Sequence, residues 1–153
     1  GSGSSLNLVS TFTLSAWLKQ GPGGNSAGTI VAKRVASNNW PYALFAVSNK
    51  LYLYKNSGAD VSVNSTDSIS ATNWVHVVAT RSGTAINFYI DGKIDSGGTK
   101  TLALGDSTAT ALLIGVQGVP PLQNYFNGLL DDVRIYNRAL STAEIQQLYR
   151  MGK

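Results

Sequence analysis

The chain has 153 residues, of which 43% are hydrophobic and only 13% are charged, as expected for one folded domain with a mostly neutral polar surface. It has no cysteine, which excludes a disulfide framework, a thiolate metal site and a cysteine nucleophile. The net charge is +4, but the basic residues are scattered, so the pattern disfavours nucleic acid as a partner, and no apolar run is long enough for a membrane span.

The first third of the chain contains several segments of strand character. Residues 1–5, GSGSS, have the composition of a linker or cloning scar. Apolar and polar side chains then alternate from Thr11 to Lys19, which predicts a strand with one apolar face and with Trp17 on the other. After a loop rich in glycine at 20–28, the sequence predicts further strands at 29–33, 42–47 and 51–55.

The strongest strand pair follows at 73–81 and 84–91. Apolar residues alternate along both segments, and Ser82-Gly83 supplies a tight turn between them. Consecutive antiparallel segments do not fit the βαβ pattern of a parallel sheet. The sequence therefore predicts an all-β protein with an antiparallel sandwich.

The closing stretch from Phe126 to Tyr149 predicts a strand followed directly by a helix. Residues 130–136 alternate with period two after an Asn-Gly turn. Ser141 stands three residues before Glu144, which is the spacing of a capping box at a helix N-terminus. Ile145 and Leu148 follow at helical spacing, so the chain should end in one short helix packed on the sandwich.

Four segments carry a resemblance to a known family: SLNLVSTFTLSAWLK, NWVHVVATRSGTAINFYIDGK, LLIGVQ and GLLDDVRIYNRALSTAEIQQLY. Together they resemble the laminin-G-like, concanavalin-A-like jelly-roll domains, over nearly the whole chain. The resemblance implies a two-sheet jelly-roll β-sandwich over residues 6–153, of the secreted lectin and adhesion type. Such domains often hold a structural calcium ion. The family normally places another strand before 11–19, and the expectation is that this strand is missing.

The acidic residues and the lone histidine do not suggest an enzyme. A glycoside hydrolase needs two carboxylates that face one sugar ring, and Glu144 is explained as a cap. Asp131 and Asp132 are neighbours, but adjacent strand residues point to opposite faces, so we expect that they do not face one substrate. His76 lies inside a strand pattern with no second histidine in the sequence, which predicts a structural hydrogen bond between the layers.

Asp131 leaves two interpretations open. In the family the first aspartate of the motif resembles a calcium ligand, and calcium takes oxygen ligands from carboxylates, carbonyls and water. Asp131 could instead cap a turn or pair with Arg134 or Arg138. One carboxylate seldom holds calcium alone, so the metal and the structural interpretation are kept side by side.

Neutral sugars bind flat aromatic rings with amide or hydroxyl groups at the rim, and loop residues are the better candidates for such contacts. The predicted ligand-binding residues are Trp40, Tyr42, Tyr52, Tyr54, Gln117, Asn124 and Tyr125, with Asn38 and Asn39 beside them. Trp40 lies in a breaker-rich stretch and could equally cover the edge of the sandwich. Trp17 and Trp74 lie within predicted strands and are better candidates for the core than Trp40.

These observations predict a non-catalytic carbohydrate-binding or adhesion module of a secreted multidomain protein, at the cell surface or outside the cell, with a glycan or a cell-surface protein as partner. The alternative is a protein-interaction or strand-acceptor domain. In that case a peptide carrying the missing strand, or a second copy of the chain, would pair beside residues 130–136. A glycoside hydrolase is the least favoured hypothesis.

Overall fold

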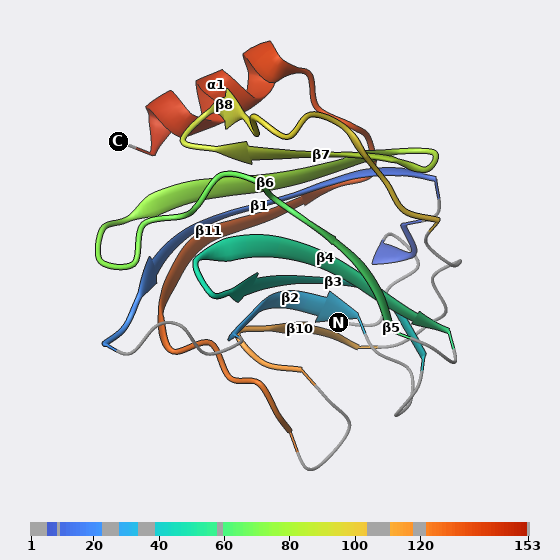
Figure 1. The fold of residues 1–153 in the computed structure, drawn as a ribbon, viewed down its shortest axis with the longest axis horizontal. Helices are drawn as coiled ribbons and strands as arrows, with labels where there is room; N and C mark the ends of the chain where they lie inside the picture. Colours follow the sequence, from blue (N-terminus) through green and yellow to red (C-terminus); the bar gives the residue numbers. More distant parts are fainter. Residues whose placement is uncertain are drawn as a thin grey trace.

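The computed structural model describes residues 6–8, 10–22, 28–33, 39–57, 60–103, 111–117 and 122–152. These residues form two antiparallel β-sheets and one helix (Figure 1). We call the sheets sheet A and sheet B. The predicted all-β jelly-roll sandwich with a C-terminal helix is confirmed.

Sheet A has the strand order β11-β1-β6-β7-β8, and a further short strand, β9, also pairs with β7. Its strands are β1 (Thr11–Gln20), β6 (Val75–Ser82), β7 (Ala85–Ile90), β8 (Lys93–Ile94), β9 (Lys100–Thr101) and β11 (Gly128–Tyr136). Sheet B has the order β10-β2-β3-β4-β5. Its strands are β2 (Gly28–Lys33), β3 (Asn39–Val47), β4 (Lys50–Ser57), β5 (Asp60–Asn64) and β10 (Leu112–Ile114).

The main core lies between the two sheets. The alternation predicted for β1 holds, because Phe12, Leu14 and Leu18 are fully buried in this core and Trp17 lies on the other face. The N-terminal residues close one end of the core. Leu8 is buried there, and the Nζ atom of buried Lys33 donates to the carbonyl of Leu6 at 3.0 Å.

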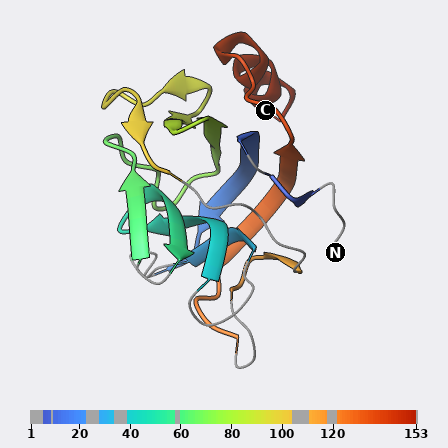
Figure 2. The same cartoon turned by 90° about the vertical axis from the view of Figure 1, so that its right-hand side faces the viewer.

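The helix α1 (Thr142–Met151) covers the outer face of sheet A, on the side away from sheet B (Figures 1 and 2). The predicted capping box is present: Ser141 accepts from the Glu144 amide, and the Glu144 carboxylate accepts from the Ser141 amide at 2.8 Å. Ile145 is fully buried against Val78, Tyr89 and Leu140. This second, smaller core fixes the helix on the sheet. Within the described residues, no helix is long and apolar enough to cross a membrane.

A bulge interrupts the pairing of β11 with β1. Ser15 pairs with Arg134 and Trp17 pairs with Asp131, so two residues of β11 oppose the single residue between Ser15 and Trp17. Asp132 takes a positive φ of 48° at this point. Because an extra residue shifts the alternation of side chains, Leu130 and Val133 can both pack against the main core.

Candidate functional site

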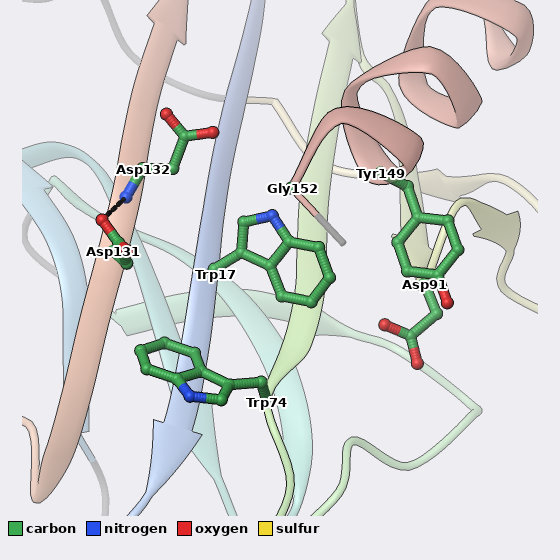
Figure 3. Close-up of a pocket in the computed structure, with 7 residues that line it drawn as sticks. All are labelled: Trp17, Trp74, Asp91, Asp131, Asp132, Tyr149 and Gly152. Carbon is green, nitrogen blue, oxygen red and sulfur yellow. Dashed lines mark hydrogen bonds between the residues drawn. The ribbon is translucent and has the colours of Figure 1, made fainter.

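A pocket of about 700 Å³ lies on the outer face of sheet A, beside the C-terminal end of α1 (Figure 3). Its walls come from β1, β11, the residue before β6, the turn after β7, and the end of α1. The lining residues are Trp17, Trp74, Asp91, Asp131, Asp132, Tyr149 and Gly152. The pocket thus combines aromatic rings with carboxylates, and none of the described residues that line it is basic.

Trp17 forms the floor of the pocket. Its indole stacks on Tyr149 of α1 with the ring centroids 5.7 Å apart and an interplanar angle of 19°. It also contacts the imidazole of His76 at 5.3 Å. Trp17 is 9% exposed, and its buried Nε1 atom has no hydrogen-bond partner within the described residues. Figure 3 shows this nitrogen on the edge of the ring nearest Gly152.

Trp74 presents an accessible aromatic surface at the pocket. It precedes β6 rather than lying within it, and 41% of it is exposed. The expectation that Trp74 is more buried than Trp40 is therefore wrong, because Trp40 is half-buried. The turn that holds it is closed by the Asn73 amide, which donates to Ser70 Oγ at 3.0 Å. Figure 3 places the indoles of Trp74 and Trp17 beside each other on the sheet face.

Asp131 and Asp132 line the same pocket, so the expectation that they point to opposite faces is wrong. The cause is the bulge in β11, which a period-two pattern does not contain. Asp132 accepts from Arg134 Nε at 2.8 Å. Asp131 accepts from the amide of Asp132 at 2.7 Å. Arg138 pairs with Glu144 and not with Asp131. Of the two structural roles considered for Asp131, pairing with an arginine and capping a local turn, the structure therefore contains the local contact, with the amide of Asp132.

Asp91 supplies the third carboxylate from the opposite side of Trp17 (Figure 3). It occupies the turn between β7 and β8 with a φ of 50°, a conformation that aspartate tolerates better than most residues. Its Oδ1 atom accepts from the backbone amide of His76 at 3.0 Å. The turn is thereby tied to the start of β6, and Asp91 is held at the edge of the pocket.

His76 lies beneath the pocket and is 2% exposed. Its Nε2 atom is 2.9 Å from Ser15 Oγ on the neighbouring strand, so its hydrogen bond lies within sheet A and not between the layers as expected. Its Nδ1 atom has no partner within the described residues. Burial lowers the pKa of His76 to about 4, so the ring is neutral at neutral pH. Covered by Trp17 and Tyr149, it serves as support for the pocket.

Three of the residues predicted to bind a ligand lie together on the outer face of sheet B. Trp40, Tyr52 and Tyr54 pack around Phe45, with Tyr52 stacked on Tyr54 at 5.7 Å and Phe45 against Tyr54 at 5.0 Å. We call these four residues the aromatic patch. Trp40 belongs to β3 and not to a loop, and each of the predicted three is only half-exposed.

Tyr42 is not part of the aromatic patch. Its ring is 1% exposed in the main core, 5.4 Å from Phe12, and its hydroxyl donates to the carbonyl of Leu6 at 3.3 Å. Burial raises the pKa of Tyr42. The pairing of β3 with β4 shifts between Trp40 and Ala43, which puts Trp40 and Tyr42 on opposite faces. A role for Tyr42 in stacking on a ligand is therefore incompatible with its position.

Gln117, Asn124 and Tyr125 lie at the other end of β2 from Trp40. The carbonyl of Asn124 accepts from the Thr29 amide near the start of β2. The last residue of β2, Lys33, pairs with Tyr42, and Trp40 lies beyond that pair. Gln117 is buried and bridges to Gln123, while Tyr125 is 63% exposed. These three residues and the aromatic patch therefore do not form one binding site. Asn38 and the side chain of Asn39 lie outside the described residues.

The donor set around Asp131 does not fit the calcium ion that the resemblance implies. Calcium takes about six to eight oxygen ligands. Asp131 already accepts from an amide and Asp132 is paired with Arg134. The described residues hold no group of three or more acidic, histidine or cysteine side chains placed to bind a metal. Calcium binding remains a prediction of the resemblance, and we derive no function from it.

Comparison with known families gives a match over most of the chain. Residues 2–146 match the family model described as the Concanavalin A-like lectin/glucanases superfamily. Among curated proteins, the zebrafish Danio rerio Adhesion G-protein coupled receptor V1 is 31% identical over 93% of this chain, and Usherin of Mus musculus is 25% identical over 93%. The chain spans only 2% and 3% of these relatives' own lengths.

Solved structures show the same fold at lower identity. Domain 4 of AbnA, a GH43 extracellular arabinanase from Geobacillus stearothermophilus solved with arabinotriose, has a TM-score of 0.71 at 22% identity, over 93% of this chain and 68% of that one. A botulinum neurotoxin type C structure, from work on its entry through two ganglioside molecules, has a TM-score of 0.68 at 17% identity, over 96% and 37%.

Proposed function

The chain belongs to the concanavalin A-like lectin/glucanases superfamily, and we propose that it is a non-catalytic carbohydrate-binding or adhesion module of an extracellular multidomain protein. The partner would be a glycan or a glycan-bearing cell-surface protein. A relative named as an adhesion receptor and a similar domain solved with arabinotriose support this proposal.

The observation that carries the proposal is the pocket on sheet A, in which the exposed indole of Trp74 stands among three carboxylates. Ligand pockets usually measure about 300 to 1,000 Å³ and combine apolar walls with a few polar groups. A sugar ring needs a flat apolar surface for its C–H face and acceptors for its hydroxyl groups. The pocket offers both, and Trp74 is more exposed than any residue of the aromatic patch, where Phe45 is buried and the other three are half-buried.

A catalytic role is disfavoured by how the carboxylates are held. Hydrolysis of a glycoside needs one carboxyl to donate a proton and another to attack or activate water. Asp132 is already bound to Arg134 at 2.8 Å, which suits a fixed acceptor better than a proton donor. Asp131 and Asp91 each accept from a backbone amide. Turnover of a polysaccharide that is lost in Asp131→Asn would contradict this assignment.

We expect Trp74→Ala to weaken glycan binding by about fivefold or more, because removing a stacked aromatic ring costs on the order of 1 to 3 kcal/mol at a binding site. Glycan-array screening followed by titration of the best ligand measures this. Trp40→Ala is the matched control, since it removes the same side chain from the aromatic patch, and it should leave the affinity unchanged. Thermal unfolding checks that both variants fold.

The opposite pattern, with binding lost in Trp40→Ala and kept in Trp74→Ala, would move the site to the aromatic patch. An array on which the wild-type protein recognises no glycan would contradict the carbohydrate-binding proposal itself.

A second candidate function, strand acceptance, rests on the edge of sheet A. Strand β11 pairs with β1 on one side, and no other strand of the described residues pairs with it. The unpaired amides and carbonyls of an edge strand are a template for another strand.

If strand acceptance occurs, a synthetic peptide of the family's first strand should bind with measurable heat. Its binding should also make the backbone amides of residues 130–136 exchange more slowly. A second copy of the chain would instead show as a dimer in sedimentation. A monomer whose stability and amide exchange do not respond to the peptide would exclude this alternative.

A further inference from the structure

We propose that the pocket on sheet A selects a sugar unit that carries a free ammonium group, so that its ligand is an amino sugar rather than a neutral or N-acetylated one. This inference rests on the proposed carbohydrate-binding function and names the class of ligand.

The charges around the pocket support a cationic ligand. Three carboxylates line it, and Asp132 is the one that forms an ion pair among the described residues, with Arg134. Asp91 and Asp131 accept one backbone amide each and have no cationic partner in the part of the chain that the structure describes. The pocket is thus an acidic region on a chain of net charge +4. His76 beneath it adds no charge at neutral pH, because burial lowers its pKa to about 4.

The aromatic walls favour the same kind of ligand. Trp17, Trp74 and Tyr149 all line the pocket, and Figure 3 shows Trp17 between the Asp131–Asp132 pair and Asp91. An ammonium group is attracted to the face of an aromatic ring, most strongly to tryptophan. A sugar ring stacked on Trp74 can therefore direct an attached ammonium group toward Asp131 on one side of Trp17 or toward Asp91 on the other.

Trp17 supplies an aromatic wall and no hydrogen bond to the ligand. This indole is nine-tenths buried, and its Nε1 donor has no acceptor within the described residues. The nitrogen lies against the end of α1, because a Cβ at Gly152 would stand 2.1 Å from it. The ligand therefore meets the face of the ring and not this donor.

An N-acetyl group would weaken the attraction to the carboxylates. Acetylation removes the positive charge and leaves one amide N–H where the ammonium group had three donors. Ionised carboxylates are acceptors, so the remaining N–H can bond to Asp91 or Asp131 only as a neutral donor. Discrimination against the acetylated sugar therefore follows from the lost attraction between charges and from the added bulk of the acetyl group.

The test uses oligosaccharides that share a β-1,4-linked backbone and differ only at the 2-position: glucosamine, N-acetylglucosamine and glucose oligomers of equal length. Calorimetric titration of the wild-type protein at neutral pH should give at least tenfold tighter binding of the glucosamine oligomer than of the other two. The affinity for the glucosamine oligomer should fall with added salt, since the attraction is partly between charges.

Two variants locate the effect. Asp131→Asn and Asp91→Asn each remove one negative charge, while the amide oxygen can still accept the backbone hydrogen bond that the aspartate accepts now. Each should weaken binding of the glucosamine oligomer by about tenfold or more and binding of the glucose oligomer by a clearly smaller factor, so that the preference for glucosamine falls. Asp67→Asn is the control for net charge, because Asp67 bonds to Ser96 outside the pocket and should not change the preference.

Equal or tighter binding of the N-acetylated or neutral oligomer would overturn the inference and leave the carbohydrate-binding proposal standing. If none of the three oligomers binds while other glycans on the array do, the inference is also overturned and the carbohydrate-binding proposal stands. An array without any hit would instead remove the underlying proposal, and the inference with it.

Discussion

Ile145→Ala should destabilise the domain by about 2 to 5 kcal/mol, the range found when a large buried aliphatic side chain is cut to alanine. Ile145 is fully buried, and it is the residue of α1 that reaches deepest into the second core, against Val78 and Tyr89. The loss combines the burial of the removed methylene and methyl groups with the cavity left between helix and sheet. Urea unfolding followed by tryptophan fluorescence measures it.

Two variants on the same helix serve as the comparison. Leu148 packs against the second core but is only partly buried, so Leu148→Ala should cost roughly 1 to 2 kcal/mol. Gln146 is exposed, and Gln146→Ala should lie within about 0.5 kcal/mol of the wild type. If Ile145→Ala proved as mild as Gln146→Ala, the helix would not be packed on sheet A in solution, and the pocket that its end lines would not exist as described.

The regular parts of the fold could be predicted because their signals are local. The alternation from Thr11 to Lys19 marks β1 and its buried face correctly. Ser141 and Glu144 form the predicted capping box because the reciprocal bonds depend on a spacing of three residues and on little else. In these segments each residue needs only its near neighbours to adopt its structure.

The positions of Asp132 and Tyr42 could not be predicted because each lies next to an irregularity in strand pairing. One extra residue in β11 turns Asp132 toward the pocket, and a register shift between Trp40 and Ala43 turns Tyr42 into the core. A bulge is created by pairing with a distant strand, so counting residues along one strand does not reveal it.

The pocket escaped prediction for a related reason. Trp17, Trp74, Asp91 and Tyr149 come from separate segments, and they meet only because α1 docks beside Trp17. One local signal was present. Gly152 directly follows α1, and a side chain there would place its Cβ about 2.1 Å from Trp17 Nε1. The glycine is thus consistent with close packing of the chain on an aromatic ring, but its partner cannot be read from the sequence.

His76 should make the domain lose stability as the pH falls from 6.5 to about 4. Burial lowers the pKa of the folded imidazole to about 4, whereas the unfolded chain should titrate near 6.5. Between these values the unfolded state binds more protons, so stability rises with pH through this window and is lost on acidification. The difference between the two pKa values corresponds to roughly 3 kcal/mol. At pH values above 6.5, His76 should contribute no pH dependence.

The acidic groups with lowered pKa values affect stability at a lower pH than His76 does. Hydrogen bonds from Arg138 and Ser141 lower the pKa of Glu144 to about 2, and those from Ser96 lower the pKa of Asp67. The stability that these carboxylates provide is present above their unfolded pKa values and is lost only below about pH 4.5. A stability loss that begins nearer pH 6 is therefore assigned to the histidine, and His76→Asn should flatten the profile between pH 6.5 and 4.5.

Because the chain has one histidine, its ring proton resonances need no assignment, and an NMR titration of the folded wild-type protein reports its pKa directly. We expect a midpoint near 4, or unfolding before the ring protonates. A midpoint near 6.5 in the folded protein would show that the imidazole gains its charge freely in solvent. That result would contradict a closed packing of Trp17 and Tyr149 over His76, and with it the floor of the pocket.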